Sequence, residues 1–286
     1  MFSDYLKSFL LYPLPHHCIS RCTFALTRWR TRLKNPAIRW FIRTFKVDMS
    51  EALEQDITAY PTFNAFFTRA IKPELRPIAP SADALACPVD GAVSQCGIIS
   101  EGRIIQAKGR DYSVLELLGG QQDWAQRFST GRFITLYLAP RDYHRIHMPH
   151  DGQLRHMLHV PGRLFSVAPH TVRAIPQLFA RNERVIACFE GTIGTFALIL
   201  VGAINVAAIE TVWHGLVTPP RDNASSKSIR RHDYDAGKVT LAKGQEMGRF
   251  NMGSTVILLT GPNIAWQSDL TSGRPVKLGE KLATLQ

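Results

Sequence analysis

From about residue 84 onward, apolar residues come in short runs separated by Gly, Pro and Asp. These runs are rich in β-branched and aromatic side chains, a pattern typical of strands joined by frequent turns. They include 92–95, 103–107, 133–138, 185–189 and 196–201. We therefore expect an α+β protein with a mainly β core, built either as a barrel or as packed sheets, and preceded by amino-terminal helices.

The first 46 residues follow a helical pattern near their end. Apolar side chains recur there at i, i+3, i+4 and i+7, while basic side chains fall on another face. The apolar positions are Ile38, Phe41, Ile42 and Phe45, and the basic positions are Arg39, Arg43 and Lys46. This spacing predicts an amphipathic helix, and shorter helical segments are expected at 113–118 and 123–128.

Positive charge is concentrated in the same region. The chain has a formal net charge of +11, and residues 1–46 hold nine Lys or Arg against one acid, Asp4, a net +8. Aromatic residues are interleaved with this charge, a combination typical of helices that lie on an anionic lipid surface. No recognised nucleic-acid module surrounds the charge, so no nucleic-acid partner is expected. We predict a membrane-associating region at 1–46 and a catalytic domain at 47–286.

Other features narrow the setting. The longest apolar run, 196–209, is too short to cross a bilayer and is typical of one or two core strands. Five cysteines show no disulfide framework, which favours a reducing compartment. Cys18 and Cys22 lie near two histidines, but no second ligand pair with zinc spacing follows them. Residues 219–236 are polar and basic, which predicts an exposed loop.

Ser254 follows a glycine and directly precedes an apolar run, 255–259, that predicts a buried strand. Gly253 lacks a Cβ and tolerates a distorted backbone, so Ser254 can attack the carbonyl carbon of the residue before it. A tight turn that enters a strand is the alternative interpretation. The Gly-x-Ser-x-Gly pattern of a nucleophile elbow is missing at Ser254, which argues against an ordinary serine hydrolase.

Two further segments hold candidate catalytic side chains. Asp90 precedes a glycine, a pair typical of a hairpin turn. His144 and His147 can point the same way on a helical turn, whereas strand alternation would place them on opposite faces. A serine needs a base to take its proton, imidazole serves near neutral pH, and a carboxylate orients the imidazole. Asp90, His147 and Ser254 therefore form a chemically consistent set.

Seven segments, in this order, closely resemble the phosphatidylserine decarboxylase proenzyme family of bacterial type. They are Pro-Val-Asp-Gly-Ala-Val-Ser-Gln (88–95), Gln-Ala-Lys-Gly (106–109), Pro-Arg-Asp-Tyr-His-Arg-Ile-His-Met-Pro (140–149), Val-Pro-Gly-Arg-Leu-Phe-Ser-Val (160–167), Leu-Phe-Ala-Arg-Asn-Glu-Arg-Val (178–185), Glu-Thr-Val-Trp (210–213) and Lys-Gly-Gln-Glu-Met-Gly-Arg-Phe (243–250). The cleavage motif of that family is usually Leu-Gly-Ser-Thr. Here it is Met252-Gly-Ser-Thr, which conserves apolar bulk and keeps the reacting Gly-Ser pair.

The resemblance implies that Ser254 attacks the carbonyl of Gly253 and that the chain is cut into 1–253 and 254–286. Ser254 would become a covalent pyruvoyl group, with Asp90 and His147 as orienting acid and base of self-cleavage. The pyruvoyl ketone would form a Schiff base with the amine of phosphatidylserine and accept electrons as carbon dioxide leaves, so no metal is expected. His144 is the candidate proton donor to the resulting carbon, with His147 second.

The resemblance also implies partners and a location. The partners are phosphatidylserine, an anionic membrane surface and the protein's own large and small chains, with a homodimer left open. The location is the cytoplasmic face of the cell membrane, held peripherally. The segment 160–167 is a candidate acyl-chain entrance, and the candidates for contact with the lipid phosphate are Lys108, Arg141 and Arg145.

Two other classes of function remain open from the residues alone. One is a membrane-binding β-domain without enzymatic activity, in which Gly253–Ser254 is only a turn. The other is a metal- or serine-dependent lipid hydrolase that uses the histidines of segment 144–159, which are His144, His147, His150, His156 and His159.

Overall fold

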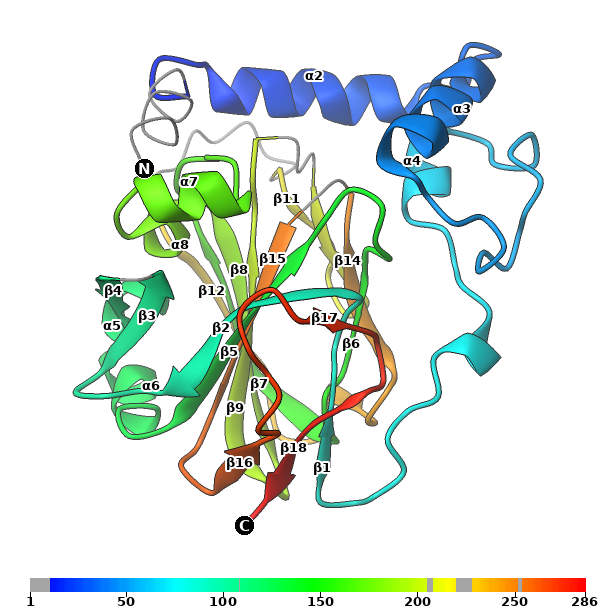
Figure 1. Cartoon of the computed structure of the whole chain (residues 1–286). Coiled ribbons are helices and arrows are strands. Elements are labelled where there is room, and N and C mark those ends of the chain that lie inside the picture. Colours follow the sequence, from blue (N-terminus) through cyan, green and yellow to red (C-terminus); the bar gives the residue numbers. More distant parts are fainter. Residues whose placement is uncertain (1–10, 108, 205–207, 220–227, 252–253) are drawn as a thin grey trace.

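The computed structural model describes residues 11–107, 109–204, 208–219, 228–251 and 254–286. Amino-terminal helices lie across one end of a β core, and the carboxyl terminus lies at the other end (Figure 1). The helices are α2 (His16–Arg28), α3 (Lys34–Phe45), α4 (Phe63–Phe67), α5 (Val114–Leu117), α6 (Gln122–Arg127), α7 (Pro169–Ala174) and α8 (Leu178–Arg181), with a 3-10 turn η1 (Pro73–Leu75). The expected mainly β architecture with amino-terminal helices is confirmed.

The amphipathic pattern predicted near residue 40 forms α3. Ile38 and Phe41 on its inner face are buried, whereas Trp40 on the other face is 62% exposed. The inner face packs against Phe66 and Phe67 of α4, which form one hydrophobic cluster with it. This cluster holds α3 and α4 together and contains residues from both sides of residue 46.

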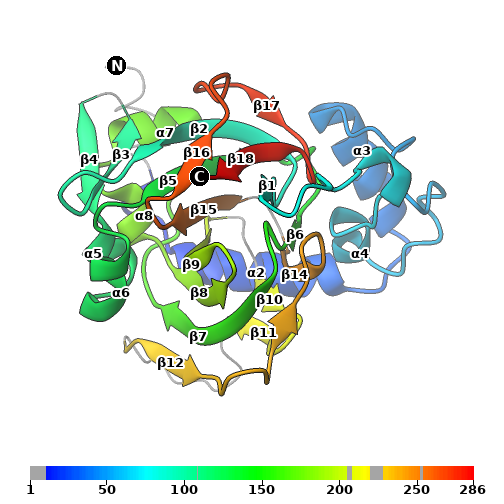
Figure 2. The same cartoon turned by 90° about the horizontal axis from the view of Figure 1, so that it is seen from below.

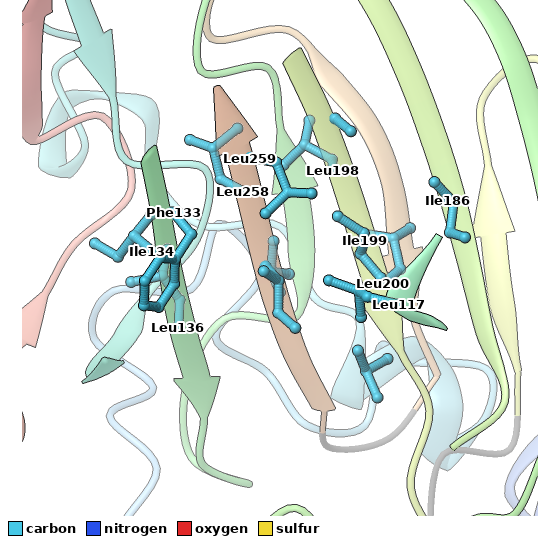
Figure 3. Close-up of a cluster of buried hydrophobic side chains, with 14 of the residues drawn as sticks. Leu117, Phe133, Ile134, Leu136, Ile186, Leu198, Ile199, Leu200, Leu258 and Leu259 are labelled. Carbon is cyan, nitrogen blue, oxygen red and sulfur yellow. The ribbon is translucent and has the colours of Figure 1, made fainter. Parts of the chain in front are cut away.

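The largest sheet carries most of the core, and its described pairings are antiparallel. Its strand order is β12 (Arg230–Asp233), β7 (Gly152–Val160), β8 (Arg184–Gly191), β9 (Gly194–Val201), β15 (Ser254–Thr260), β5 (Arg132–Leu138), β2 (Gly91–Ile98) and β17 (Pro275–Val276), with β13 (Thr240–Leu241) also paired to β7. All of β15 is buried, as are residues 196–201 of β9. Figure 3 shows Leu198, Leu200 and Leu258 among the side chains that pack there. Burial on both faces explains why these strands are continuous apolar runs in the sequence.

Two smaller sheets and a two-stranded ribbon complete the β core. One sheet has the order β11 (Gly215–Thr218), β10 (Ile209–Thr211), β14 (Glu246–Phe250) and β6 (Arg145–His147), and the other β1 (Ala84–Ala86), β18 (Lys281–Leu285) and β16 (Ile264–Trp266). The ribbon is β3 (Arg103–Ala107) with β4 (Arg110–Ser113). In both views α3 and α4 lie on the side of β6 and β14, away from α5 and α6 (Figure 2). The described strands thus form packed sheets rather than a closed barrel.

Two local predictions were wrong. Asp90 and Gly91 do not turn a hairpin, because β1 and β2 on either side of them belong to different sheets. The segment 219–236 is not all loop, because β12 pairs with β7 and extends the sheet; residues 220–227 lie outside the described part. The helices expected at 113–118 and 123–128 are confirmed as α5 and α6. Both predictions failed because pairing with strands distant in the sequence determines the structure of these segments. Local turn and polarity signals carry no information about that pairing.

Candidate functional site

Ser254 is the first residue of β15. Its partner across the sheet is Leu138, the last residue of β5. The Ser254 side chain is fully buried, and its Oγ has no hydrogen-bond partner among the described residues. Buried polar groups without partners are rare and costly in folded proteins, which marks this hydroxyl as a functional candidate. Gly253, the other half of the expected cleavage site, lies outside the described residues.

A mainly apolar cavity of about 140 Å³ is lined by Ser254. Phe41 and Phe45 of α3 and Phe67 of α4 form part of its wall, together with residues 166–168. The amino-terminal helices therefore contribute directly to the surroundings of the serine. The end of the segment 160–167 also reaches this cavity, where an acyl-chain entrance was predicted.

His144 lies just before β6 and is completely buried. Its Nδ1–H donates to the carbonyl oxygen of Asp142 at 2.7 Å, and its Nε2 has no partner among the described residues. The imidazole packs against Phe67, with 4.2 Å between ring centroids. Burial lowers the pKa of His144 from 6.5 to about 3. His144 is therefore neutral at physiological pH, with a lone pair on Nε2.

His147 is the last residue of β6, so the extended alternative is confirmed and the helical turn is not formed. Its Nδ1–H donates to the carbonyl oxygen of Gly244 at 2.8 Å, and its Nε2 lies 3.2 Å from the hydroxyl of Tyr143. Burial lowers the pKa of His147 below its ordinary value, an effect that the Gly244 carbonyl and the charges of Glu246 and Asp90 oppose. The backbone contact thus fixes the tautomer and leaves Nε2 as the basic nitrogen.

Asp90 is buried directly before β2 and forms an ion pair with Arg76. The Nη2 of Arg76 lies 2.6 Å from Asp90 Oδ2, and its Nε lies 2.9 Å from Oδ1. The backbone N–H of Leu278 also donates to Asp90 at 2.8 Å. Arg76 reaches Glu51 as well, at 2.5 Å. Asp90 is thus held rigidly by partners other than a histidine.

The structure brings the predicted residues together only in part. Within the described residues, no hydrogen bond joins Asp90 to His147, and none joins either of them to Ser254. Asp90 reaches His147 only through its charge, which opposes in part the lowering of the His147 pKa by burial. His144 and Ser254 share a neighbour, since Phe67 packs on His144 and lines the cavity at Ser254.

A second and larger cavity, of about 570 Å³, lies beside Asp90. It is lined by charged residues that include Arg69 and Arg76, and it shares Tyr137 with the cavity at Ser254. Sequence reasoning missed these two arginines, because the segment that carries them has no recognisable motif and each depends on residues distant in the chain.

The remaining sequence candidates have other environments. His150 contacts the carbonyl oxygen of Ala82 at 2.7 Å, His156 pairs with Asp233, and His159 contacts Glu183 at 2.8 Å. In the described part of the chain, no three His, Cys, Asp or Glu side chains are grouped to hold a metal ion. The three residues predicted to contact the lipid phosphate do not share one site. Arg141 lines the larger cavity, and Arg145 forms an ion pair with Glu246. Lys108 lies outside the described residues.

These features define the chain as a mainly β protein with a buried serine at the start of a core strand, covered by amino-terminal helices. A family model described as phosphatidylserine decarboxylase matches residues 63–284, and a second, described as PSD, matches residues 6–46. The chain belongs to the phosphatidylserine decarboxylase family.

Relatives named phosphatidylserine decarboxylase proenzyme match most of the chain. The one from Alkalilimnicola ehrlichii is 57% identical over 262 residues, which cover 90% of this chain and 88% of that protein. The one from Pseudomonas fluorescens is 52% identical over 273 residues, covering 95% and 94%. The one from Bordetella pertussis is 52% identical over 287 residues, covering 99% and 95%.

Proposed function

We propose that this chain is a self-processing phosphatidylserine decarboxylase, which converts phosphatidylserine into phosphatidylethanolamine and carbon dioxide. It first cuts itself between Gly253 and Ser254. The observation that carries the proposal is the buried Oγ of Ser254, which lacks a hydrogen-bond partner among the described residues and lines an apolar cavity. Relatives named as proenzymes support a maturation step.

The self-cleavage needs water as its only co-reactant. Ser254 Oγ bonds to the carbonyl carbon of Gly253, the peptide C–N bond breaks, and the nitrogen takes the hydroxyl proton. A base then takes the Cα proton of residue 254 as the Cβ–Oγ bond breaks, leaving a carboxylate on Gly253 and a dehydroalanine at position 254. Water replaces the nitrogen, ammonia leaves, and a pyruvoyl group remains on chain 254–286. No oxidant or reductant is consumed.

We assign His147 as the base of the self-cleavage and Asp90 as the acidic residue that supports His147. The contact of His147 Nδ1–H with Gly244 leaves Nε2 free to take a proton, in exchange for its contact with Tyr143. When Nε2 takes a proton the ring becomes cationic, and the nearby charge of Asp90 favours that form. Arg76 fixes the position of Asp90. The support from Asp90 is therefore electrostatic.

The surroundings of Ser254 fit a pyruvoyl group at that position, because Ser254 Oγ is a buried polar atom without a partner in the described part of the chain and lines a mainly apolar cavity. A pyruvoyl carbonyl there supplies the electron sink that loss of carbon dioxide requires. We assign His144, whose Nε2 has no partner among the described residues, as the group that passes a proton to the substrate carbon. The substrate ammonium, which must lose a proton to react, is the source of that proton. The apolar wall excludes competing water.

We also propose that the amino-terminal helices hold the enzyme peripherally on an anionic membrane, at its cytoplasmic face. Four large apolar side chains on this region are more than 60% exposed, and they border an apolar cavity of about 540 Å³: Leu26, Trp29, Leu33 and Trp40. Arg28 at the end of α2 pairs with Glu210 of β10 at 2.9 Å, which ties this surface to the β core. No helix in the described residues is long and apolar enough to cross a membrane.

A denaturing gel with intact-mass measurement tests the proposal. Purified protein should appear as chains 1–253 and 254–286, the small chain should react with hydroxylamine, and carboxyl-labelled phosphatidylserine should release carbon dioxide. Ser254→Ala should abolish cleavage and release together. Ser166→Ala, a matched change in the same cavity, should leave cleavage intact. An uncut wild-type chain that releases no carbon dioxide would refute the proposal.

A further inference from the structure

Arg69, two residues after α4, carries a buried charge that the described protein atoms satisfy only in part. The residue is 5% exposed. Its Nη2 donates to the carbonyl oxygen of Arg141 at 3.1 Å, whereas its Nε and Nη1 have no hydrogen-bond partner among the described residues. The guanidinium carbon lies 5.5 Å from the ring centroid of Phe66. A guanidinium cannot shed its charge, so the two remaining donors require an acceptor.

Arg69 lines the cavity of about 570 Å³. The acidic residues that line the same cavity have partners other than Arg69. Within the described residues, no carboxylate lies within ion-pair distance of Arg69. The partners of the acids are Arg76 for Asp90, Arg76 and Lys277 for Glu51, Arg141 and the Ala139 N–H for Asp142, and Ser50 for Asp48. An anion that enters this cavity therefore finds a buried cation with two donors, Nε and Nη1, that have no partner among the described residues.

This cavity adjoins the one at Ser254. Tyr137 lines both cavities, and the next residue, Leu138, pairs with Ser254 across the sheet. The carbonyl that accepts from Arg69 belongs to Arg141, in the turn that follows β5. A ligand that spans the two cavities can therefore reach position 254 with one end and Arg69 with the other.

We propose that Arg69 binds the phosphodiester of the lipid headgroup, while the serine end of that headgroup reaches position 254. The inference rests on the proposed function. The carboxylate of the same headgroup is the less suitable partner, because its charge disperses as carbon dioxide leaves. An arginine bound to it would stabilise the ground state more than the transition state. The phosphodiester keeps its charge throughout, so binding it costs no rate.

The first test uses the uncleaved Ser254→Ala protein, which contains both cavities and needs no maturation. Calorimetric titration compares glycerophosphoethanolamine, which has the phosphodiester but no carboxylate, with ethanolamine, which has neither. Arg69→Gln in this background should weaken glycerophosphoethanolamine binding by about tenfold or more, since a charge-assisted contact is lost. Ethanolamine should be unaffected, and Arg69→Lys should give an intermediate loss because it keeps the charge but not the planar guanidinium donors.

Lys46→Gln is the matched control, because Lys46 lines the same cavity and the change removes the same charge. An equal loss in Lys46→Gln would mean that general electrostatics binds the anion and would overturn the assignment of Arg69. So would an equal loss for ethanolamine, or a wild-type cavity that shows no preference for the phosphodiester. Near-UV circular dichroism checks folding; if Arg69→Gln misfolds, Arg69→Lys decides the outcome.

The second test uses the processed enzyme on vesicles that contain phosphatidylserine. Arg69→Gln should raise KM by about tenfold with little change in kcat, because the contact is the same in ground and transition states. A fall in kcat at unchanged KM would overturn the proposal. If wild-type protein releases no carbon dioxide but the Ser254→Ala protein binds the phosphodiester through Arg69, the proposed function fails and the site stands.

Discussion

The ring centroid of Phe67 lies 4.2 Å from that of His144, and the same phenyl ring lines the cavity at Ser254. Both side chains are almost completely buried. Phe67 is held in turn by Phe41 of α3, at 5.9 Å between centroids. The amino-terminal helices therefore keep water from a histidine of the β core, and they influence its protonation as well as the shape of the cavity.

Phe67→Leu should raise the pKa of His144 from about 3 toward its ordinary value, because burial is the main cause of the lowering and a smaller side chain admits water. Titration of the imidazole by NMR in the Ser254→Ala background measures the shift. Phe66→Leu on the same helix is the control, since Phe66 packs on Phe41 and Tyr60. An unchanged pKa in Phe67→Leu would show that other groups exclude the water.

His144→Gln should flatten the dependence of stability on pH. Native His144 stays neutral down to about pH 3, whereas in the unfolded chain it takes a proton below about pH 6.5. The unfolded state therefore binds more protons between these values, and the free energy of unfolding falls as the pH drops below 6.5, by up to about 1.4 kcal/mol per pH unit.

Urea unfolding of the Ser254→Ala protein, with and without His144→Gln, measures this difference at a series of pH values below 6 and above 7. Above pH 7 the two proteins should show the same slope, which serves as the internal control. Equal slopes below pH 6 as well would contradict the buried, neutral state of His144.

Arg76→Gln should destabilise the protein by about 3–5 kcal/mol, because it leaves the Asp90 charge buried without its cation. The Arg76 side chain is 3% exposed and that of Asp90 11%. Self-cleavage should slow in the same variant, as Asp90 loses its fixed position. Urea unfolding and a time course on denaturing gels measure the two effects.

Lys277→Gln is the control for Arg76→Gln. Lys277 also pairs with Glu51 beside the same cavity, but its side chain is 63% exposed. Its loss should cost about 1 kcal/mol or less, as for other exposed ion pairs. If Arg76→Gln costs no more than Lys277→Gln, the buried pair does not stabilise Asp90 as inferred.

The core strands could be predicted from the sequence because burial on both faces leaves a local signal. The runs 196–201 and 256–259 are uninterrupted apolar segments, and they lie within β9 and β15. The periodicity of α3 is equally local. Strand pairing is not a local property of the sequence. The order of the large sheet and the separation of β1 from β2 at Asp90 therefore could not be predicted from turn chemistry.

The candidate site also has a part that could be predicted from the sequence and a part that could not. Ser254 could be placed at the start of a strand, because the glycine and the apolar run adjoin it in the sequence. The contact of His144 with Phe67 could not be predicted, since tertiary packing brings the two residues together. Arg69 and Arg76 lie in a segment without periodicity, and their importance depends on cavities and acids contributed by distant residues.

Replacing Trp29 and Trp40 together by Ser should weaken binding to vesicles of anionic phosphatidylserine by about tenfold or more, because two exposed aromatic side chains no longer enter the lipid interface. Flotation with such vesicles measures binding, and raised salt should weaken it further in both proteins. Carbon dioxide release should fall on vesicles at low lipid concentration and remain near wild type on detergent-dispersed substrate. The control is Ile98→Ser with Ile105→Ser, at 61% and 52% exposure on β2 and β3. Equal loss in the control would place the membrane contact elsewhere.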